Sequence, residues 1–234
     1  MNLDGMSTAC RTTNFMITAV VLAACSAPGP PSPTAAAPSP TAAVAPYAAR
    51  VEGLPEAVRA EMTGVSWRVG CPLSLSRLRL VTVVHWGLDG KVHSGELVVR
   101  DDLAPRIVRV FGKLHDGRFP IAAMRRVDAY RGDDHASMAA DNTSMFNCRN
   151  AEGSRSWSRH AYGEAIDINP VENPYVKGDT ILPPAGAAFL DRRNVRPGMV
   201  VAGDVVTRAF AAEGFHWGGQ FSSLRDYQHF ELAQ

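Results

Sequence analysis

The stretch of residues 158–170 constrains the fold more than any other part of the chain. It reads Ser-Arg-His-Ala-Tyr-Gly-Glu-Ala-Ile-Asp-Ile-Asn-Pro, with an imidazole at His160 and a carboxylate at Asp167. Apolar and polar side chains alternate over 165–169, which predicts a short strand that ends at Pro170, because proline cannot donate to a sheet ladder. An aspartate on such an apolar strand needs a cation, since burying an unpaired carboxylate costs several kcal/mol. A metal ion is one candidate for that cation, and His160 is placed to share it.

A second alternating segment, residues 226–232, offers a further ligand. It reads Asp-Tyr-Gln-His-Phe-Glu-Leu, and strand periodicity places His229 and Glu231 on one face. If this strand lies beside the first, the side chains of His160, Asp167 and His229 converge. Two imidazoles and one carboxylate, with a fourth position open to water, form a catalytic zinc arrangement. The spacing is compatible with zinc but does not single out these three residues, because a chain of this length offers other histidines and aspartates.

Several motifs together make the chain similar to a known family. The pattern Ser-x-His-x-x-Gly-x-Ala-x-Asp at 158–167, followed by Asp-Tyr-Gln-His-Phe-Glu at 226–231, resembles the zinc D-Ala-D-Ala carboxypeptidases. These are the VanY-like peptidases, which are related in fold to VanX dipeptidases and to phage L-Ala-D-Glu endopeptidases. The similarity extends from about Gly70 to the C-terminus. It includes Trp-Gly-Leu-Asp-Gly-Lys-Val-His at 86–93, Asp-Asn-Thr-Ser at 141–144 and Trp-Gly-Gly at 217–219.

The resemblance implies a general base three residues before the last histidine, where the family commonly has glutamate. Here Asp226 fills that position with a side chain one methylene shorter. Strand parity instead favours Glu231, so Glu231 is either the hydrogen-bond partner of the ligand His229 or a rival base. Beside a bound zinc ion, the base takes the proton of the attacking water and passes it to the leaving amine.

The resemblance also implies substrate contacts. Ser158 resembles the family serine that helps to hold the terminal carboxylate of the substrate. Arg131 resembles the arginine that stabilises the developing oxyanion. A surface arginine paired with a neighbouring aspartate is the alternative for Arg131, and Arg149 is a second candidate for the oxyanion role. Trp217 precedes two glycines that let the main chain approach closely, and we expect it to form a pocket wall.

The N-terminal segment predicts export. The apolar run at 15–24 is too short to span a bilayer as a mature helix, and it fits the hydrophobic region of a signal peptide over residues 1–24. Leu-Ala-Ala-Cys at 22–25 resembles the bacterial lipobox, so we expect cleavage before Cys25 and lipidation of that residue. An ordinary signal peptide is the alternative. Residues 25–46 are rich in Pro, Ala, Ser and Thr, which predicts an extended tether to a domain at 47–234.

Cysteine content and charge narrow the function further. Of the four cysteines, Cys10 lies in the signal segment and Cys25 at the lipobox, which leaves Cys71 and Cys148 for the folded domain. A pair of cysteines in an exported protein predicts a disulfide, with a catalytic cysteine as the alternative. The net charge of +1 and the lack of a basic run give no reason to expect a nucleic-acid partner. The sequence also contains no Ser-x-x-Lys, the signature of serine-type penicillin-binding chemistry.

The remaining patterns predict an α+β fold. We expect a mainly antiparallel sheet with flanking helices, because hairpin-linked strands alternate with amphipathic helices. The expected elements are a helix at 55–62, strands at 78–86 and 92–99, a helix from about residue 101, a strand at 120–130, an irregular polar segment at 133–150 and a helix at 204–213.

We therefore expect a single zinc-peptidase domain, exported and lipid-anchored to the outer face of the cytoplasmic membrane. It would act as a monomer on peptidoglycan stem peptides, and removal of the terminal D-Ala is the preferred reaction. One alternative is cleavage between L-Ala and a D-amino acid, as in the phage relatives. Another is an inactive zinc- and wall-binding lipoprotein, which the shortened side chain of Asp226 keeps open.

Overall fold

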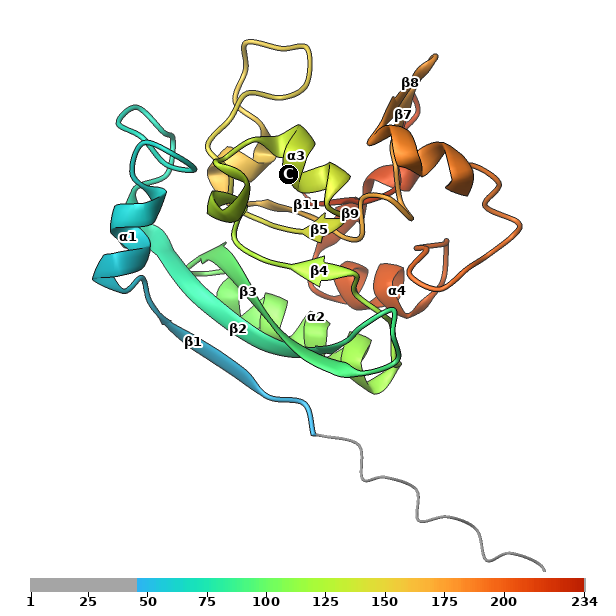
Figure 1. Ribbon diagram of the computed structural model, residues 1–234, viewed down its shortest axis with the longest axis horizontal. Helices are drawn as coiled ribbons and strands as arrows, with labels where there is room; N and C mark the ends of the chain where they lie inside the picture. Colours follow the sequence, from blue (N-terminus) through green and yellow to red (C-terminus); the bar gives the residue numbers. More distant parts are fainter. Residues whose placement is uncertain (1–45, 234) are drawn as a thin grey trace, which may run out of the picture. The chain divides into compact units, whose positions relative to one another are not determined.

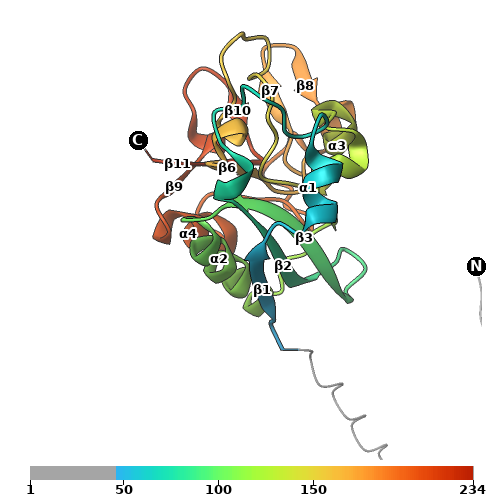
Figure 2. The ribbon, with the colours of Figure 1, turned by 90° about the vertical axis from the view of Figure 1, so that its left-hand side faces the viewer.

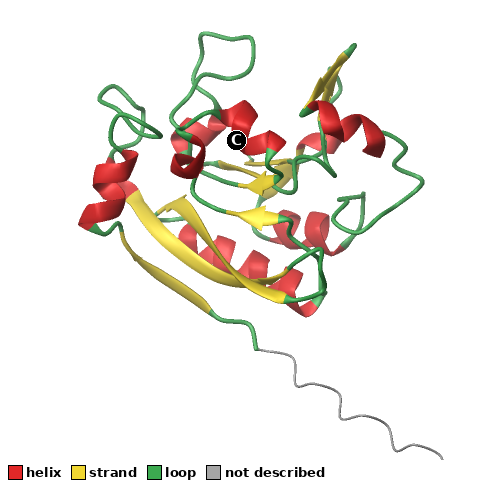
Figure 3. Ribbon diagram, in the orientation of Figure 1, coloured by secondary structure: helices red, strands yellow, loops and turns green. Residues whose placement is uncertain are grey.

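The structure is a computed structural model that describes residues 46–233. The expected signal peptide, the lipidation site Cys25 and the tether up to residue 45 lie outside the described residues. Within the described part, the α+β fold class with mainly antiparallel sheets is confirmed (Figure 3). No helix in residues 46–233 is long and apolar enough to cross a membrane.

The largest sheet has three antiparallel strands in the order β1-β2-β3 (Figure 1). Strand β1 spans Ala49–Gly53, and a short helix η1 leads into β2. The predicted hairpin at Asp89-Gly90 joins the two long strands, and Gly90 adopts a positive φ of 70° that favours glycine. The bounds are Leu75–Arg77 for η1, Leu78–Trp86 for β2 and Val92–Arg100 for β3.

Two helices pack together beside this sheet, and α2 lies against strand β2 (Figure 2). Helix α2 (Ala104–Asp116) turns Ile107 and Phe111 into the main core, as its apolar spacing predicts. Helix α4 (Val205–Ala212) begins where the Asp204 side chain accepts a hydrogen bond from the main-chain N–H of Thr207 at 2.7 Å. Both helices therefore bury one face in a core that they share with the sheet.

A second antiparallel sheet has the order β6-β11-β9. Strand β6 (Ala165–Asp167) is the motif strand expected from the sequence, and β11 (His229–Leu232) lies beside it. Strand β9 (Phe215–Trp217) completes the sheet. Its inner side belongs to the main core, which fixes the position of the strands that carry the candidate ligands.

A third sheet has the order β10-β7-β8 and is also antiparallel. Strand β10 (Arg225–Asp226) pairs with β7 (Tyr175–Lys177), which forms a hairpin with β8 (Thr180–Leu182). The hairpin projects from the domain in Figure 1, and the helix η4 (Pro184–Phe189) follows it.

The segment from residue 120 to 150 differs from the expectation. The strand predicted at 120–130 is mostly wrong. Only two of its residues pair in a sheet, and the chain then forms a short helix. The polar segment after it is more regular than expected, since the Asp133 side chain caps a helix by accepting from the N–H of Ala136 at 3.0 Å. The elements are β4 (Ala123–Met124), η2 (Val127–Tyr130), α3 (Asp134–Ala139) and β5 (Asn142–Thr143), and β4 pairs with β5 in parallel.

The predicted disulfide between Cys71 and Cys148 is present. Cys148 is buried in a smaller apolar cluster with Met62 at the end of helix α1 (Glu56–Met62). The bond therefore ties the N-terminal part of the domain to the loop that begins at Arg149.

Candidate metal centre

His160 is held by a short helix that its neighbours define. Helix η3 (Arg159–Tyr162) begins after Ser158, whose Oγ accepts from the main-chain N–H of His160 at 3.3 Å. It ends at Gly163, which takes a positive φ of 62°. The glycine between the imidazole and the carboxylate in the motif therefore makes the turn that brings His160 back beside strand β6.

The strand register places the other two ligand candidates directly opposite each other. In the pairing of β6 with β11, Asp167 faces His229. His229 Nδ1 lies 3.0 Å from Asp167 Oδ1, and His160 Nε2 lies 3.1 Å from Asp167 Oδ2. One ligand atom from each of the three side chains lies within 4.8 Å of the others, and all three residues are buried.

The surroundings of His160 fit a metal ligand. Its Nδ1 lies 2.6 Å from the carbonyl oxygen of Met145, so Nδ1 donates and the lone pair is left on Nε2. Nε2 is buried and faces the carboxylate of Asp167, whose Oδ2 lies 3.1 Å away. A metal-bound histidine has this arrangement, with its outer nitrogen fixed by a carbonyl and its inner nitrogen facing another ligand candidate.

Glu231 occupies the outer position on the other imidazole. Its Oε2 lies 3.3 Å from Nε2 of His229, while Nδ1 of the same ring faces Asp167. The Glu231 carboxylate thus orients the His229 ring and raises the basicity of Nδ1, which would be the nitrogen that binds a metal. Of the two roles considered for Glu231, this geometry matches the partner of a ligand.

The cluster attracts positive charge. Burial by itself raises the pKa of Asp167, but the two neighbouring imidazoles outweigh burial and hold this pKa well below its usual range. Burial lowers the pKa of His229, yet its hydrogen bonds to Asp167 and Glu231 outweigh that effect and raise the pKa to about 10. The proton on His229 here stands in for part of the positive charge that a bound cation would supply.

Asp226 lies beside the cluster at the end of β10. Burial raises the pKa of its carboxyl to about 6, although the charge of His229 opposes part of this increase. Its Oδ1 atom is fully covered and has no hydrogen-bond partner among the described residues. Gly218 makes room for it, because a Cβ on that glycine would lie 2.6 Å from the carbonyl oxygen of Asp226 and 3.2 Å from the Cβ of His229.

A break in the strand allows Asp226 and His229 to serve one site. Strand parity over 226–232 predicts that these two side chains point to opposite faces. In the structure the segment is divided at Tyr227 and Gln228, so Asp226 pairs with β7 and His229 pairs with β6. The chain changes sheets between the two residues, and both reach the same cavity.

The cavity has a volume of about 280 Å³, and it opens between the β7–β8 hairpin and the loop that follows Arg149. These two segments are the upper projections of the domain in Figure 1. The wall contains both signs of charge beside apolar side chains. Its charged and histidine residues are Asp134, Arg149, Glu152, Arg159, His160, Asp167, Lys177, Asp226, His229 and Glu231.

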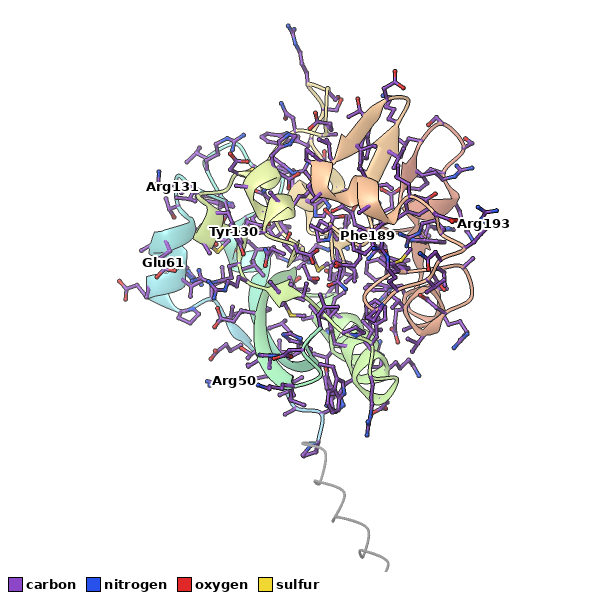
Figure 4. All side chains as sticks on the ribbon, turned by 45° about the vertical axis from the view of Figure 1, so that its right-hand side comes forward. Arg50, Glu61, Tyr130, Arg131, Phe189 and Arg193 are labelled. Atoms are coloured by element: carbon purple, nitrogen blue, oxygen red, sulfur yellow. A yellow bond between two sulfur atoms is a disulfide. The ribbon has the colours of Figure 1, made fainter. Side chains whose placement is uncertain are left out.

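The structure places Arg149, and not Arg131, at this cavity. Arg149 Nε lies 2.7 Å from Asp134 Oδ1, so the carboxylate that was the alternative partner of Arg131 holds Arg149 instead. Arg131 is exposed and lies at the edge of the domain in Figure 4, toward Glu61 of α1. The reason is local, because Arg131 has a left-handed φ of 58° and the next residue packs against the main chain of Val65.

Of the two other expected substrate contacts, the cavity includes Ser158 but not Trp217. Trp217 packs against the main core, and its Nε1 donates to the carbonyl oxygen of Tyr227 at 2.8 Å. This bond holds the main chain of Tyr227, between strands β10 and β11. Trp217 therefore supports the main chain behind the site and does not form the wall of the cavity.

Sequence reasoning missed the contribution of β7. Tyr175 and Lys177 line the cavity from a strand that starts eight residues after Asp167. A signal was available in the alternation of Tyr, Val and Lys after Asn-Pro at 173–174, which is typical of a strand with one exposed face.

An α+β domain that gathers two imidazoles and a carboxylate at the base of a cavity, beside a further buried carboxylate, has the features of a metal-dependent peptidase. The comparison with known families gives the more particular result. Residues 152–232 match the D-alanyl-D-alanine carboxypeptidase family, which confirms the resemblance seen in the motifs. The match includes Ser158, the three ligand candidates and Asp226. Searches of curated proteins and of solved structures returned no match.

Proposed function

We propose that this protein is a zinc-dependent peptidase that removes the terminal D-Ala from peptidoglycan stem peptides. The observation that carries the proposal is the buried Asp226 carboxylate beside the cluster of His160, Asp167 and His229 at the base of one cavity. The family match at residues 152–232 supports the reaction class.

The three ligand candidates suit zinc, because two neutral imidazoles and one carboxylate leave a net positive charge on the metal. Bound zinc supplies a Lewis acid that polarises the scissile carbonyl and favours ionisation of water. His160 and His229 are pre-oriented for this role by Met145 and Glu231, which bond to their outer nitrogens. Such fixed donors lower the cost of ordering the site when the metal binds.

Asp226 acts as the general base and then as the general acid. Its carboxylate accepts a proton from the attacking water and delivers that proton to the nitrogen of the leaving D-Ala. Burial raises the pKa of this carboxyl above its ordinary value, which makes Asp226 a stronger base for accepting the proton.

Arg149 takes the role that the sequence first suggested for Arg131. Asp134 fixes one edge of the guanidinium, while the residue lines the same cavity as the ligands. A guanidinium in this position stabilises negative charge on a substrate oxygen, either the developing oxyanion or the terminal carboxylate. Ser158 lines the same cavity, and its hydroxyl donates a hydrogen bond to the terminal carboxylate of the substrate.

The proposal includes export and anchoring by a lipid on Cys25. The lipobox-like sequence at 22–25 and the disulfide of Cys71 with Cys148 support a site of action outside the cytoplasm. The partner would then be the peptidoglycan on the outer face of the membrane, reached through the tether at 25–46.

The decisive experiment uses the full chain incubated with a muropeptide that has a complete pentapeptide stem, with zinc or with a chelator. We expect loss of one alanine by mass spectrometry, abolished by the chelator. Release of the peptide beyond L-Ala would instead establish the endopeptidase reaction. Zinc-loaded protein that yields no product would contradict a peptidase and support a zinc- and wall-binding protein.

A further inference from the structure

One wall of the cavity is formed by side chains of strands β10, β7 and β8. In the pairing of β10 with β7, Asp226 lies opposite Tyr175, and in the pairing of β7 with β8, Leu182 lies opposite the same tyrosine. Residues opposite each other share a face, and so do residues two apart on one strand. Lys177 therefore points to the same side as Asp226 and Tyr175, and all of these side chains line the cavity.

Lys177 differs from the other two cations of the cavity. Arg149 pairs with Asp134 at 2.7 Å, and Arg159 pairs with Glu164 at 2.8 Å. Arg159 also donates to the carbonyl oxygen of Leu232 at 2.9 Å. Within residues 46–233, Lys177 has no ion-pair partner. It is thus the cavity cation whose charge the protein leaves unneutralised.

The distance between Lys177 and Asp226 determines which part of a bound substrate Lys177 can contact. Neighbouring strands lie about 4.8 Å apart, and two residues along a strand span about 6.8 Å. The lysine is therefore roughly 8 Å diagonally from Asp226 across the sheet. An extended substrate advances about 3.3 to 3.6 Å per residue, so this separation corresponds to the second residue from the scissile bond.

We propose that Lys177 is a specificity-determining residue that binds a carboxylate of the stem peptide. The inference rests on the proposed function, and it adds the chemical group that the enzyme selects. Two sources offer such a group. One is a free carboxylate on the side chain of the third stem residue, two positions before the bond that is cut, and the other is the terminal carboxylate of the leaving D-Ala.

The expected selectivity is modest, because Lys177 is exposed at the rim. Partly exposed pairs of ammonium and carboxylate stabilise a complex by up to about 1 kcal/mol, which corresponds to about fivefold in kcat/KM. The effect falls in KM, since the lysine does not touch the reacting atoms, and it decreases as salt concentration rises.

The test compares three pentapeptide stems in the zinc-loaded full chain. The first has a diamino acid with a free side-chain carboxylate at position three, the second has the carboxamide of that side chain, and the third keeps the free side chain but ends in a carboxamide. The variants are Lys177→Met and Lys177→Glu. Arg225→Met is the matched control, because this exposed cation lies opposite Val176 and hence on the other face of the same sheet.

The expected result is a preference of about fivefold for the first stem, lost in Lys177→Met and reversed in Lys177→Glu, while Arg225→Met keeps it. A loss of discrimination against the second stem assigns the side-chain carboxylate, and a loss against the third assigns the terminal one. If Lys177→Met retains the discrimination of the wild type in both comparisons, the inference is wrong and the proposed function stands. If zinc-loaded wild type cleaves none of the stems, the proposed function fails and the inference fails with it.

Discussion

The two small sheets that border the cavity differ in how they are supported. The β6-β11-β9 sheet is part of the main core, where Ile166 and Phe230 are completely buried and the ring of Phe230 stacks on Phe210 at 4.1 Å. In the β10-β7-β8 sheet, Tyr175 and Val176 are only half-buried and Lys177 is exposed. The first sheet carries two of the three candidate metal ligands, Asp167 and His229, and the third, His160, lies on η3 just before β6. The second sheet carries the proposed base Asp226 and the proposed substrate contact Lys177.

Under the proposed function, this difference separates the part of the site that needs rigidity from the part that would select the substrate. A metal site needs ligands fixed by packing and by hydrogen bonds to their outer atoms. Substrate selection tolerates a sheet with fewer buried contacts, because a charged rim residue acts over a longer range. Asp226 stands at the junction, on the second sheet but directed at the first.

The strongest test of the metal site beside the first sheet is the substitution His160→Ala. We expect loss of bound zinc and a decrease in kcat/KM of at least about a thousandfold, because a three-ligand site reduced to two no longer holds the metal. Metal content of the purified protein and activity on a pentapeptide stem measure the two effects. His93→Ala is the control, since that histidine is exposed and paired with Asp89 away from the cavity. Full zinc occupancy in His160→Ala would remove His160 from the ligand set.

At the junction, Asp226→Asn separates metal binding from catalysis. We expect normal zinc content and a decrease in kcat of about a hundredfold to ten-thousandfold, because the amide cannot accept the proton of water. The matched variant Glu231→Gln should lose zinc affinity as well as activity, since this side chain orients a ligand. The reverse pattern, with catalysis lost and zinc retained only in Glu231→Gln, would make Glu231 the base.

The position of Asp226 also depends on the absence of a Cβ atom at Gly218. In Gly218→Ala, the new methyl group displaces the main chain at Asp226, and we expect kcat/KM to fall about tenfold while unfolding becomes easier by about 1 to 3 kcal/mol. Thermal unfolding and steady-state kinetics measure the change. Gly53→Ala is the control, because a Cβ at that position meets no atom within 4 Å. Unchanged kinetics in Gly218→Ala would show that Asp226 does not need this close fit.

The smallest effect concerns the segment that connects the two sheets. In that segment, burial and a hydrogen bond to Asp141 raise the pKa of Glu172 from 4.5 to about 8. The folded protein therefore binds an extra proton between these values, so the free energy of unfolding falls as pH rises from about 4.5 to about 8.

The variant Glu172→Gln should show a flatter pH dependence and greater relative stability in alkaline solution. Melting temperatures of metal-free protein at about pH 5 and about pH 9 measure the slope without interference from metal release. The exposed residue Glu56 supplies the control Glu56→Gln. Parallel pH profiles of wild type and Glu172→Gln would show that this carboxyl has an ordinary pKa.

Local patterns predicted the elements whose periodicity matches their burial. The hairpin of β2 and β3, helix α4 with its Asp204 cap, and strand β6 all follow from side-chain alternation or capping residues. The strand expected at 120–130 failed because its polar groups have other partners. The N–H of Arg125, for example, donates to the side chain of Asn142 at 2.7 Å, so that part of the chain joins no longer strand.

The candidate ligands were found from sequence because they lie in two alternating motifs that together resemble a known family, although Asp167 and His229 are 62 residues apart. The position of Arg149 beside the cavity was not predictable in the same way. It depends on an ion pair with Asp134, fifteen residues earlier, that no local pattern predicted. The shared orientation of Asp226 and His229 was hidden as well, because strand periodicity assumes one continuous strand.

The β7–β8 hairpin has a consequence for how such an enzyme diversifies. Its tip at Gly178 is exposed, a Cβ added there would meet no atom within 4 Å, and the hairpin joins the domain through β10 and η4. Residues exchanged or inserted at this tip leave the buried strands untouched. The sequence of the hairpin can therefore vary, in evolution or by design, and alter the substrates that fit the cavity while the candidate metal site stays the same.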